Sequence, residues 1–255
     1  MTDSQGSFVW YEFMSADVAA AKAFYGKVVG WNMEDVPVTD LTYTLLSAGK
    51  RQVGGMMTMP QRVSDGGMKP FWAAHIAVDD VDAAAAKVQR LGGKVHREPT
   101  DIPNVGRFAS LADRQGAHFL LFKPTRPAER AVSSVPGDIG WHELHTSDWP
   151  NAFEFYSSMF GWTKGDSVDM GPTGTYQLFK IGDANAGGML NSPGAKSASF
   201  WLYYFVVDDI DAAALRVSAN GGTLRQGPQQ VPGGGWIVQA ADKEGAAFAL
   251  LGARK

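Results

Sequence analysis

The chain has 255 residues, enough for one large domain or two of about 125 residues each. Its hydrophobic content of 45% is typical of a folded protein, and its net charge of −3 does not favour nucleic acid or an anionic membrane as partner. The absence of cysteine excludes disulfides and thiolate metal sites and fits a cytoplasmic protein. We find no secretory signal at the N-terminus and no apolar run near the ~18 residues of a membrane span.

The first elements are predicted from hydrophobic periodicity. An alternating strand begins at Phe8 and gives way to a helix at Asp17. The helix is predicted over residues 18–29, followed by a strand over 41–47 and one or two strands within 51–59. The same order, one strand, one helix and three strands, is then predicted again for residues 72–78, 80–91, 94–97, 107–112 and 118–123.

The whole pattern recurs in the second half of the chain. Asp17 matches Asp148 after 131 residues, and the Asp-x-x-Gly motif at Asp113 matches the one at Asp242 after 129 residues. Such self-similarity indicates an internal duplication. A segment rich in proline separates the copies, so we predict a first domain over 1–123, a linker over 124–138 and a second domain over 139–255.

Aspartates mark the four predicted helix starts, where a carboxylate can accept hydrogen bonds from the free N–H groups of the first turn. They are Asp17, Asp80, Asp148 and Asp209. Gly92 is expected to end the helix of residues 80–91 in a left-handed conformation. The aromatic pairs at 24–25 and 155–156 have helical spacing with other apolar residues, so we interpret them as core.

Four strand-helix-three-strand units with these landmarks resemble the vicinal oxygen chelate superfamily, which includes glyoxalase I, bleomycin-resistance proteins and extradiol dioxygenases. The resemblance covers nearly the whole chain. It implies an α+β fold of four βαβββ modules, paired into two glyoxalase-like domains with curved mixed sheets around a cavity. In the enzymes of the superfamily, that cavity holds a divalent metal ion.

The resemblance also maps three metal-ligand positions onto each copy. They fall on Trp10, Ala73 and Leu120 in the first copy and on Trp141, Leu202 and Ala249 in the second. None of these side chains can act as a metal ligand. We therefore predict no metal at the usual positions and no other cofactor.

A displaced site is the alternative. Glu12, His75 and His118 each lie two residues from a lost ligand position, and they could converge if the strands of the two histidines are antiparallel neighbours. One carboxylate and two imidazoles can bind Fe(II) or Zn(II). The same residues could instead form a buried polar cluster, which we favour, or act as general base and acid on a bound ligand.

Ligand-binding candidates come from strand alternation and from matching positions in the two copies. They are Trp10, Met14, Tyr43, Met57, Arg107, Trp141, Glu143, His145, Tyr176, Tyr204 and Trp236. His142 and His145 should point to opposite faces of their strand, so they cannot chelate one ion, and His96 is expected at the surface.

Three functions remain open at this point. The first is binding of a small, partly apolar molecule without metal, the second is a lyase, isomerase or dioxygenase that uses the displaced site, and the third is a structural protein with filled cavities. A monomer suffices for the predicted fold, with a homodimer as the alternative.

Overall fold

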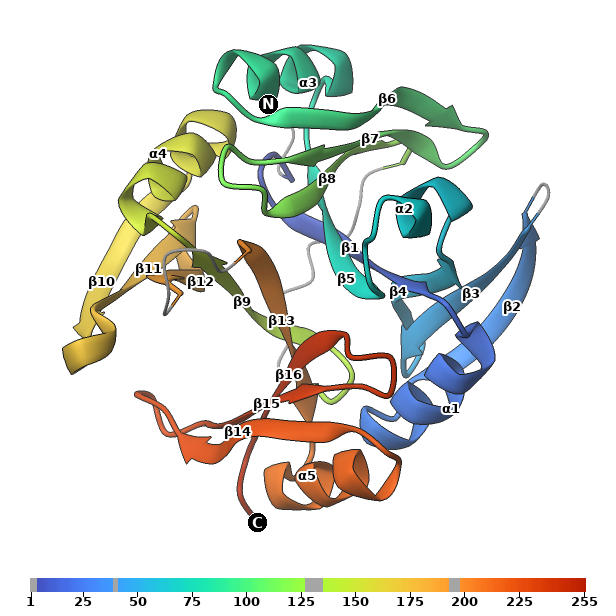
Figure 1. The fold of residues 1–255 in the computed structure, drawn as a ribbon, viewed down its shortest axis with the longest axis vertical. Helices are drawn as coiled ribbons and strands as arrows, with labels where there is room; N and C mark the ends of the chain where they lie inside the picture. The colour runs from blue at the N-terminus through green and yellow to red at the C-terminus, as the bar shows by residue number, and fades with distance from the viewer. Residues whose placement is uncertain (1–3, 39–40, 127–134, 193–197) are drawn as a thin grey trace. The chain divides into compact units, whose positions relative to one another are not determined.

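A computed structural model describes residues 4–38, 41–126, 135–192 and 198–255 (Figure 1). Part of the predicted linker, residues 127–134, lies outside the described residues. The first copy contains β1 (Phe8–Ser15), α1 (Val18–Val28), β2 (Asn32–Val38), β3 (Leu41–Ala48), β4 (Arg51–Thr58), α2 (Gln61–Asp65), β5 (Phe71–Ala77), α3 (Val81–Arg90), β6 (Lys94–Ile102), β7 (Gly106–Ala112) and β8 (His118–Pro124).

The second copy repeats this order. It contains β9 (Ile139–Thr146), α4 (Trp149–Phe160), β10 (Thr163–Asp169), the 3-10 turn η1 (Gly171–Thr173), β11 (Thr175–Ile181), β12 (Ala184–Asn191), β13 (Phe200–Val207), α5 (Ile210–Ala219), β14 (Thr223–Gln230), β15 (Trp236–Ala241) and β16 (Ala247–Gly252). The predicted fourfold series of one strand, one helix and three strands is thereby confirmed.

Each copy forms one eight-stranded mixed sheet. The strand orders are β2-β3-β4-β1-β5-β8-β7-β6 and β10-β11-β12-β9-β13-β16-β15-β14. Within each module the first and last strands pair in parallel, and the remaining neighbours are antiparallel. The predicted α+β fold with mixed sheets is confirmed, while the domain boundaries stay a prediction.

The predicted helix starts are also confirmed. In each of the four modules an aspartate carboxylate accepts a hydrogen bond from a backbone N–H of the first turn, which satisfies a donor that has no partner within the helix. The donors are the N–H groups of Ala20, Ala83, Asn151 and Ala212. Gly92 ends α3 with a φ of 84°, a conformation that glycine adopts without steric cost.

Edge strands account for the main differences from prediction. Strand β2 was not predicted, because it is largely exposed and contains Pro37, so it lacks the alternating apolar pattern. The same reasoning applies to β6, which continues five residues beyond the predicted end at 97 and contains Pro99. Of the one or two strands predicted within 51–59, the structure has one, over residues 51–58, and the short helix α2 was not expected.

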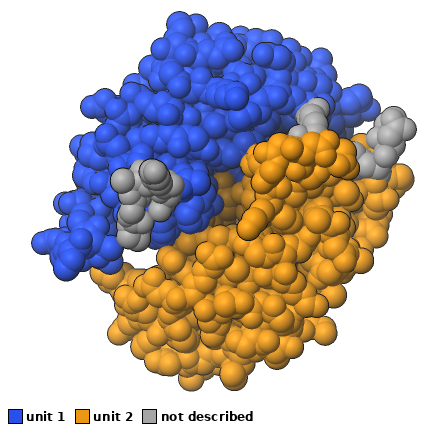
Figure 2. Space-filling view, in the orientation of Figure 1, with its two compact units in different colours: residues 1–9, 73–131, 142–201 blue, residues 10–72, 132–141, 202–255 orange. Residues whose placement is uncertain are grey.

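The packing of the chain groups it into two compact units (Figure 2). Unit 1 comprises residues 1–9, 73–131 and 142–201, and unit 2 comprises residues 10–72, 132–141 and 202–255. Each unit therefore combines one module from each copy. In unit 2, α1 packs with α5, and in unit 1, α3 packs with α4.

Each unit has an aromatic core. The aromatic pairs on α1 and α4 are buried, which confirms their interpretation as core residues. In unit 2 the core includes Tyr25, Trp31, Trp72, Phe205 and Phe248, and in unit 1 it includes Phe119, Phe155, Tyr156, Trp162 and Trp201. In the described part of the chain, no helix has both the length and the apolar character needed to cross a membrane.

Candidate functional site

In the first copy, the carboxylate of Glu12 on β1 is held by a tyrosine from β3. The Tyr43 hydroxyl donates to Glu12 Oε1 at 3.1 Å and accepts from Trp10 Nε1 at 2.9 Å. Burial, and then the nearby charge of Glu12, raise the pKa of Tyr43 well above its ordinary value. Tyr43 therefore stays protonated and acts as a hydrogen-bond donor to the carboxylate.

The second copy repeats the glutamate–tyrosine contact and adds a histidine. The Tyr176 hydroxyl on β11 donates to Glu143 Oε2 at 2.9 Å. His145 Nε2 lies 2.7 Å from Glu143 Oε1, and the imidazole stacks on Phe200 with ring centroids 4.7 Å apart. In the first copy, Met14 occupies the position of His145, so the two copies differ in what accompanies the glutamate.

A glycine makes room for each tyrosine ring. Gly55 on β4 is the register partner of Glu12, and a Cβ built on Gly55 would lie 2.1 Å from the Tyr43 hydroxyl oxygen. Gly188 has the same relation to the ring of Tyr176, at 2.3 Å. Any side chain here would displace the tyrosine, so the second glycine of each Gly-Gly-Met sequence is required for the glutamate–tyrosine contact.

We expect Gly55→Ala to lower the free energy of unfolding by about 1–3 kcal/mol, because the new methyl group overlaps the Tyr43 ring. The matched control is Gly26→Ala in α1. There the added Cβ would meet only Met33, at an ordinary 3.9 Å, and alanine favours a helix by about 0.5–1 kcal/mol. Denaturant unfolding of both variants checks this prediction; equal stabilities would contradict it.

His75 and His118 occupy neighbouring strands that run parallel. His75 on β5 is in register with Leu120 on β8, so His118 lies two residues away along the strand direction. The condition of antiparallel neighbours is therefore wrong, and the two histidines remain offset by two residues along the strands, as Ala73 and Leu120 are. The argument that Glu12, His75 and His118 converge depended on antiparallel strands and no longer holds. A shared role for the three residues stays a prediction.

The surroundings of these two histidines differ in polarity. The His75 ring lies 5.5 Å from the Phe122 ring and 6.4 Å from the Phe108 ring. His118 Nε2 is 2.8 Å from Ser110 Oγ. His96 is exposed, as predicted.

The usual metal-ligand positions do not fit a metal ion. Ala73, Leu120, Leu202 and Ala249 are at most 3% exposed and carry no donor atom. The only polar hydrogen of the Trp10 side chain is donated to the Tyr43 hydroxyl oxygen. In the described ranges, no group of three or more histidine, aspartate or glutamate side chains could hold a metal ion.

The other ligand-binding candidates have protein partners. Arg107 donates to Asp82 at 2.7 Å and to Asp101 at 2.9 Å, in an exposed cluster. The Tyr204 hydroxyl accepts from Gln239 Nε2 at 2.9 Å. Trp141 packs against the buried cluster of Leu202, Tyr204 and Ala249, the Arg254 guanidinium lies over the Trp236 ring, and Met57 is in register with Met14.

The histidines of β9 point to opposite sides, as predicted. His142 Nδ1 donates to the Ala186 carbonyl at 2.7 Å, and its ring stacks on Phe8 with centroids 3.8 Å apart. Burial lowers the pKa of His142 from 6.5 to about 4, so the ring is neutral at physiological pH. His145 instead contacts Glu143 and Phe200, so the two rings cannot share one ion.

The aspartates of the Asp-x-x-Gly motifs belong to buried hydrogen-bond chains that the sequence did not predict. In unit 2, Trp72 Nε1 donates to the Tyr25 hydroxyl at 2.8 Å, and this hydroxyl donates to Asp242 Oδ2 at 2.9 Å. Trp201, Tyr156 and Asp113 form the same chain in unit 1. Burial raises the pKa of both aspartates above the ordinary value, while the hydrogen-bond donors oppose that rise.

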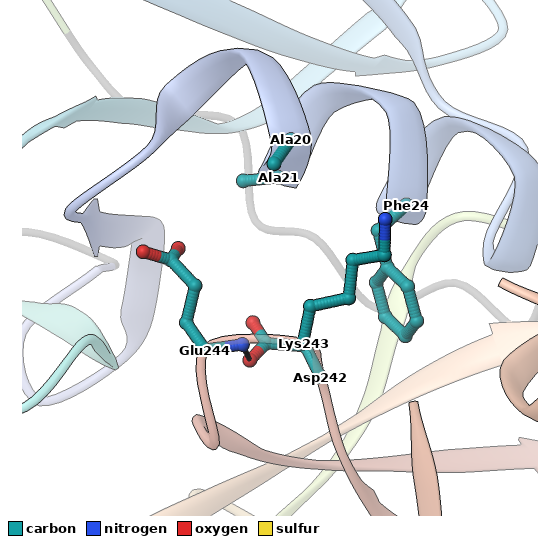
Figure 3. Close-up of a pocket in the computed structure, with 6 residues that line it drawn as sticks. All are labelled: Ala20, Ala21, Phe24, Asp242, Lys243 and Glu244. Atoms are coloured by element: carbon teal, nitrogen blue, oxygen red, sulfur yellow. Dashed lines mark hydrogen bonds between the residues drawn. The ribbon is translucent and has the colours of Figure 1, made fainter. Parts of the chain in front are cut away.

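A small pocket in unit 2 adjoins one of these chains (Figure 3). It lies between α1 and residues 242–244 and holds about 10 Å³, room for one water molecule. The Glu244 carboxylate beside it accepts from the Ser15 hydroxyl and from the N–H groups of Ala16 and Asp17. These contacts join the turn after β15 to the start of α1, so the pocket belongs to the packing of the unit.

Comparison with known proteins gives the family. The family model "Glyoxalase/Bleomycin resistance protein/Dioxygenase superfamily" matches residues 7–121 and again residues 138–250. The chain belongs to this superfamily, as its strand order and repeated modules indicate.

Several relatives span nearly the whole chain. It is 33% identical over 249 residues to the protein named "Putative glyoxylase CFP32" of Mycobacterium tuberculosis, covering 97% of this chain and 95% of the relative. It is 30% identical to "Anthracycline biosynthesis protein DnrV" of Streptomyces peucetius, covering 98% and 94%. The Mn(II)-bound glyoxalase from Novosphingobium aromaticivorans shares the fold, with a TM-score of 0.67, 18% identity, and coverage of 99% of this chain and 83% of that one.

Proposed function

We propose that the protein binds a small, partly apolar organic molecule through the glutamate–tyrosine pairs of its two copies, without a metal at the usual positions. The observation that carries this proposal is the pairing itself. In both copies a tyrosine crosses a glycine to orient the glutamate carboxylate, while the usual metal-ligand positions carry tryptophan, alanine or leucine. An oriented carboxylate is a hydrogen-bond acceptor for a hydroxyl or N–H group of a ligand.

The surrounding side chains support a partly apolar ligand. Trp10 is held in place by its hydrogen bond to Tyr43, and Met14 lies beside Met57 across the paired strands β1 and β4. Indole and thioether groups supply adaptable apolar contact, and a few polar groups then fix the orientation of the ligand. The match to a protein of anthracycline biosynthesis supports an oxygen-rich aromatic ligand.

We also propose that the protein is cytoplasmic and that it binds its ligand as a monomer. The lack of cysteine suits a cytoplasmic protein. Both glutamate–tyrosine pairs belong to one chain, so a monomer suffices for binding.

The test is a titration with a fluorescent anthracycline. We expect saturable binding to the wild-type chain, weakened about ten- to a hundredfold in the variant that carries both Glu12→Gln and Glu143→Gln, because this variant lacks the charged acceptors of the ligand's hydrogen bonds. A hydrogen bond to a charged group contributes about 1.5–3 kcal/mol, and each 1.4 kcal/mol corresponds to a factor of ten in Kd.

His96→Gln is the matched control, because His96 is exposed and contacts neither glutamate. Its affinity should equal that of the wild type. No saturable binding to the wild type, or equal affinities of the wild type and the double variant, would contradict the proposal.

A further inference from the structure

We propose that Glu143 and His145 form a proton-accepting pair, which takes the proton of an acidic hydroxyl group, such as a phenol or an enol, on the molecule bound by the second copy. This inference rests on the proposed function, and it adds the chemical class of the ligand. It concerns the second copy alone, since Met14 replaces the histidine in the first copy.

The hydrogen bonds assign the protons of this pair. Both carboxylate oxygens of Glu143 are occupied, Oε2 by the Tyr176 hydroxyl and Oε1 by His145 Nε2. A carboxylate only accepts, so Nε2 carries the hydrogen of the neutral imidazole. The lone pair therefore lies on Nδ1, for which none of the residues that the structure describes is a partner.

The imidazole is both fixed and accessible. Its plane is within 2° of the plane of Phe200, with ring centroids 4.7 Å apart, so stacking and the bond to Glu143 set the ring orientation. The His145 side chain is 15% exposed, and Phe200 is 38% exposed, a large value for an aromatic residue. A ligand ring can thus contact Phe200 while its hydroxyl group reaches Nδ1.

A carboxylate lies in direct contact with His145. Among the described residues, Glu143 contacts the imidazole and Tyr176 contacts Glu143, while the neighbouring strands contribute Leu190 in register and Phe200. When the ligand O–H bond breaks, its electron pair stays on the ligand oxygen and a new N–H bond forms at Nδ1. The resulting imidazolium is stabilised by the carboxylate of Glu143, as in other carboxylate–imidazole pairs.

The experiment uses 4-nitrophenol, whose phenolate absorbs visible light, and its methyl ether 4-nitroanisole, which has nearly the same shape and no acidic proton. At a pH where free 4-nitrophenol is protonated, we expect the probe bound to the wild-type chain to show the phenolate band. His145→Gln should abolish the band and lower the ratio of 4-nitrophenol affinity to 4-nitroanisole affinity at least tenfold.

His145→Gln retains an amide donor for Glu143, and circular dichroism checks that the variant is folded. Glu143→Gln should also abolish the phenolate band, because it removes the charge that stabilises the imidazolium. If both probes bind the wild type equally and no band forms, the inference is overturned while the proposed binding function stands. If neither probe binds, the inference is overturned, and the proposed binding function is overturned with it only when the anthracycline titration also fails.

Discussion

Replacing Tyr25 by phenylalanine is expected to lower the free energy of unfolding by about 3 kcal/mol. The Tyr25 hydroxyl is buried between two groups, accepting from Trp72 Nε1 at 2.8 Å and donating to Asp242 Oδ2 at 2.9 Å. Its removal leaves a buried indole N–H and a buried carboxylate oxygen without that partner. Each such group costs about 1–3 kcal/mol, and denaturant unfolding measures the sum.

A double-mutant cycle isolates this contribution. In a Trp72→Phe background, one of the two groups is already gone, so Tyr25→Phe should cost less than in the wild type, with a coupling of about 0.5–3 kcal/mol. Tyr156→Phe is the counterpart in unit 1, where Trp201 and Asp113 flank the hydroxyl, and a similar loss is expected. A loss below about 0.5 kcal/mol in both variants would contradict the role assigned to these hydrogen-bond chains.

The second large effect is a fall in the free energy of unfolding at acid pH that depends on His142. Burial holds the pKa of His142 at about 4 instead of 6.5 in the folded chain. Below pH 6.5 the unfolded chain therefore binds a proton that the folded chain does not. The part of the free energy of unfolding that comes from neutral His142 is fully present above pH 6.5 and is lost as the pH falls toward 4. At 1.36 kcal/mol per pKa unit, this loss is about 3 kcal/mol.

His142→Phe is the variant that tests this effect, because it retains an aromatic ring for the stack on Phe8 and cannot titrate. The free energy of unfolding is measured for both proteins between about pH 7 and pH 4. Loss of the bond to Ala186 lowers the stability of the variant at every pH, so only the difference between the two pH profiles matters. Between about pH 7 and pH 4, the free energy of unfolding of the wild type should fall by about 3 kcal/mol more than that of the variant. Parallel profiles would contradict the depressed pKa of His142.

Features encoded by neighbouring residues could be predicted from the sequence. Each helix-start aspartate bonds to an N–H two or three residues away, so its role is visible in the local pattern. Strand alternation likewise indicated that His142 and His145 point apart. Strand β2 could not be found in this way, since an exposed edge strand with a proline has little apolar alternation.

Features that depend on distant residues could not be predicted. The residues of β5 and β8 do not indicate whether the two strands pair in parallel or antiparallel. The structure shows that they pair in parallel. Tyr25 and Asp242 are 217 residues apart, so each was interpreted by itself, as a core residue and as a turn landmark. The glutamate–tyrosine pairs had a sequence signal in the repeated Gly-Gly-Met motif, but only the crossing of the Tyr43 ring over Gly55 gives that motif its meaning.

Metal analysis combined with the anthracycline titration tests metal-independent ligand binding most directly. Protein purified without added metal should contain far less than one equivalent of iron, zinc, manganese or nickel per chain, and its affinity for the anthracycline should not change after treatment with a chelator. One equivalent of metal that is lost in Glu12→Ala, together with loss of anthracycline binding on chelation, would contradict metal-independent binding.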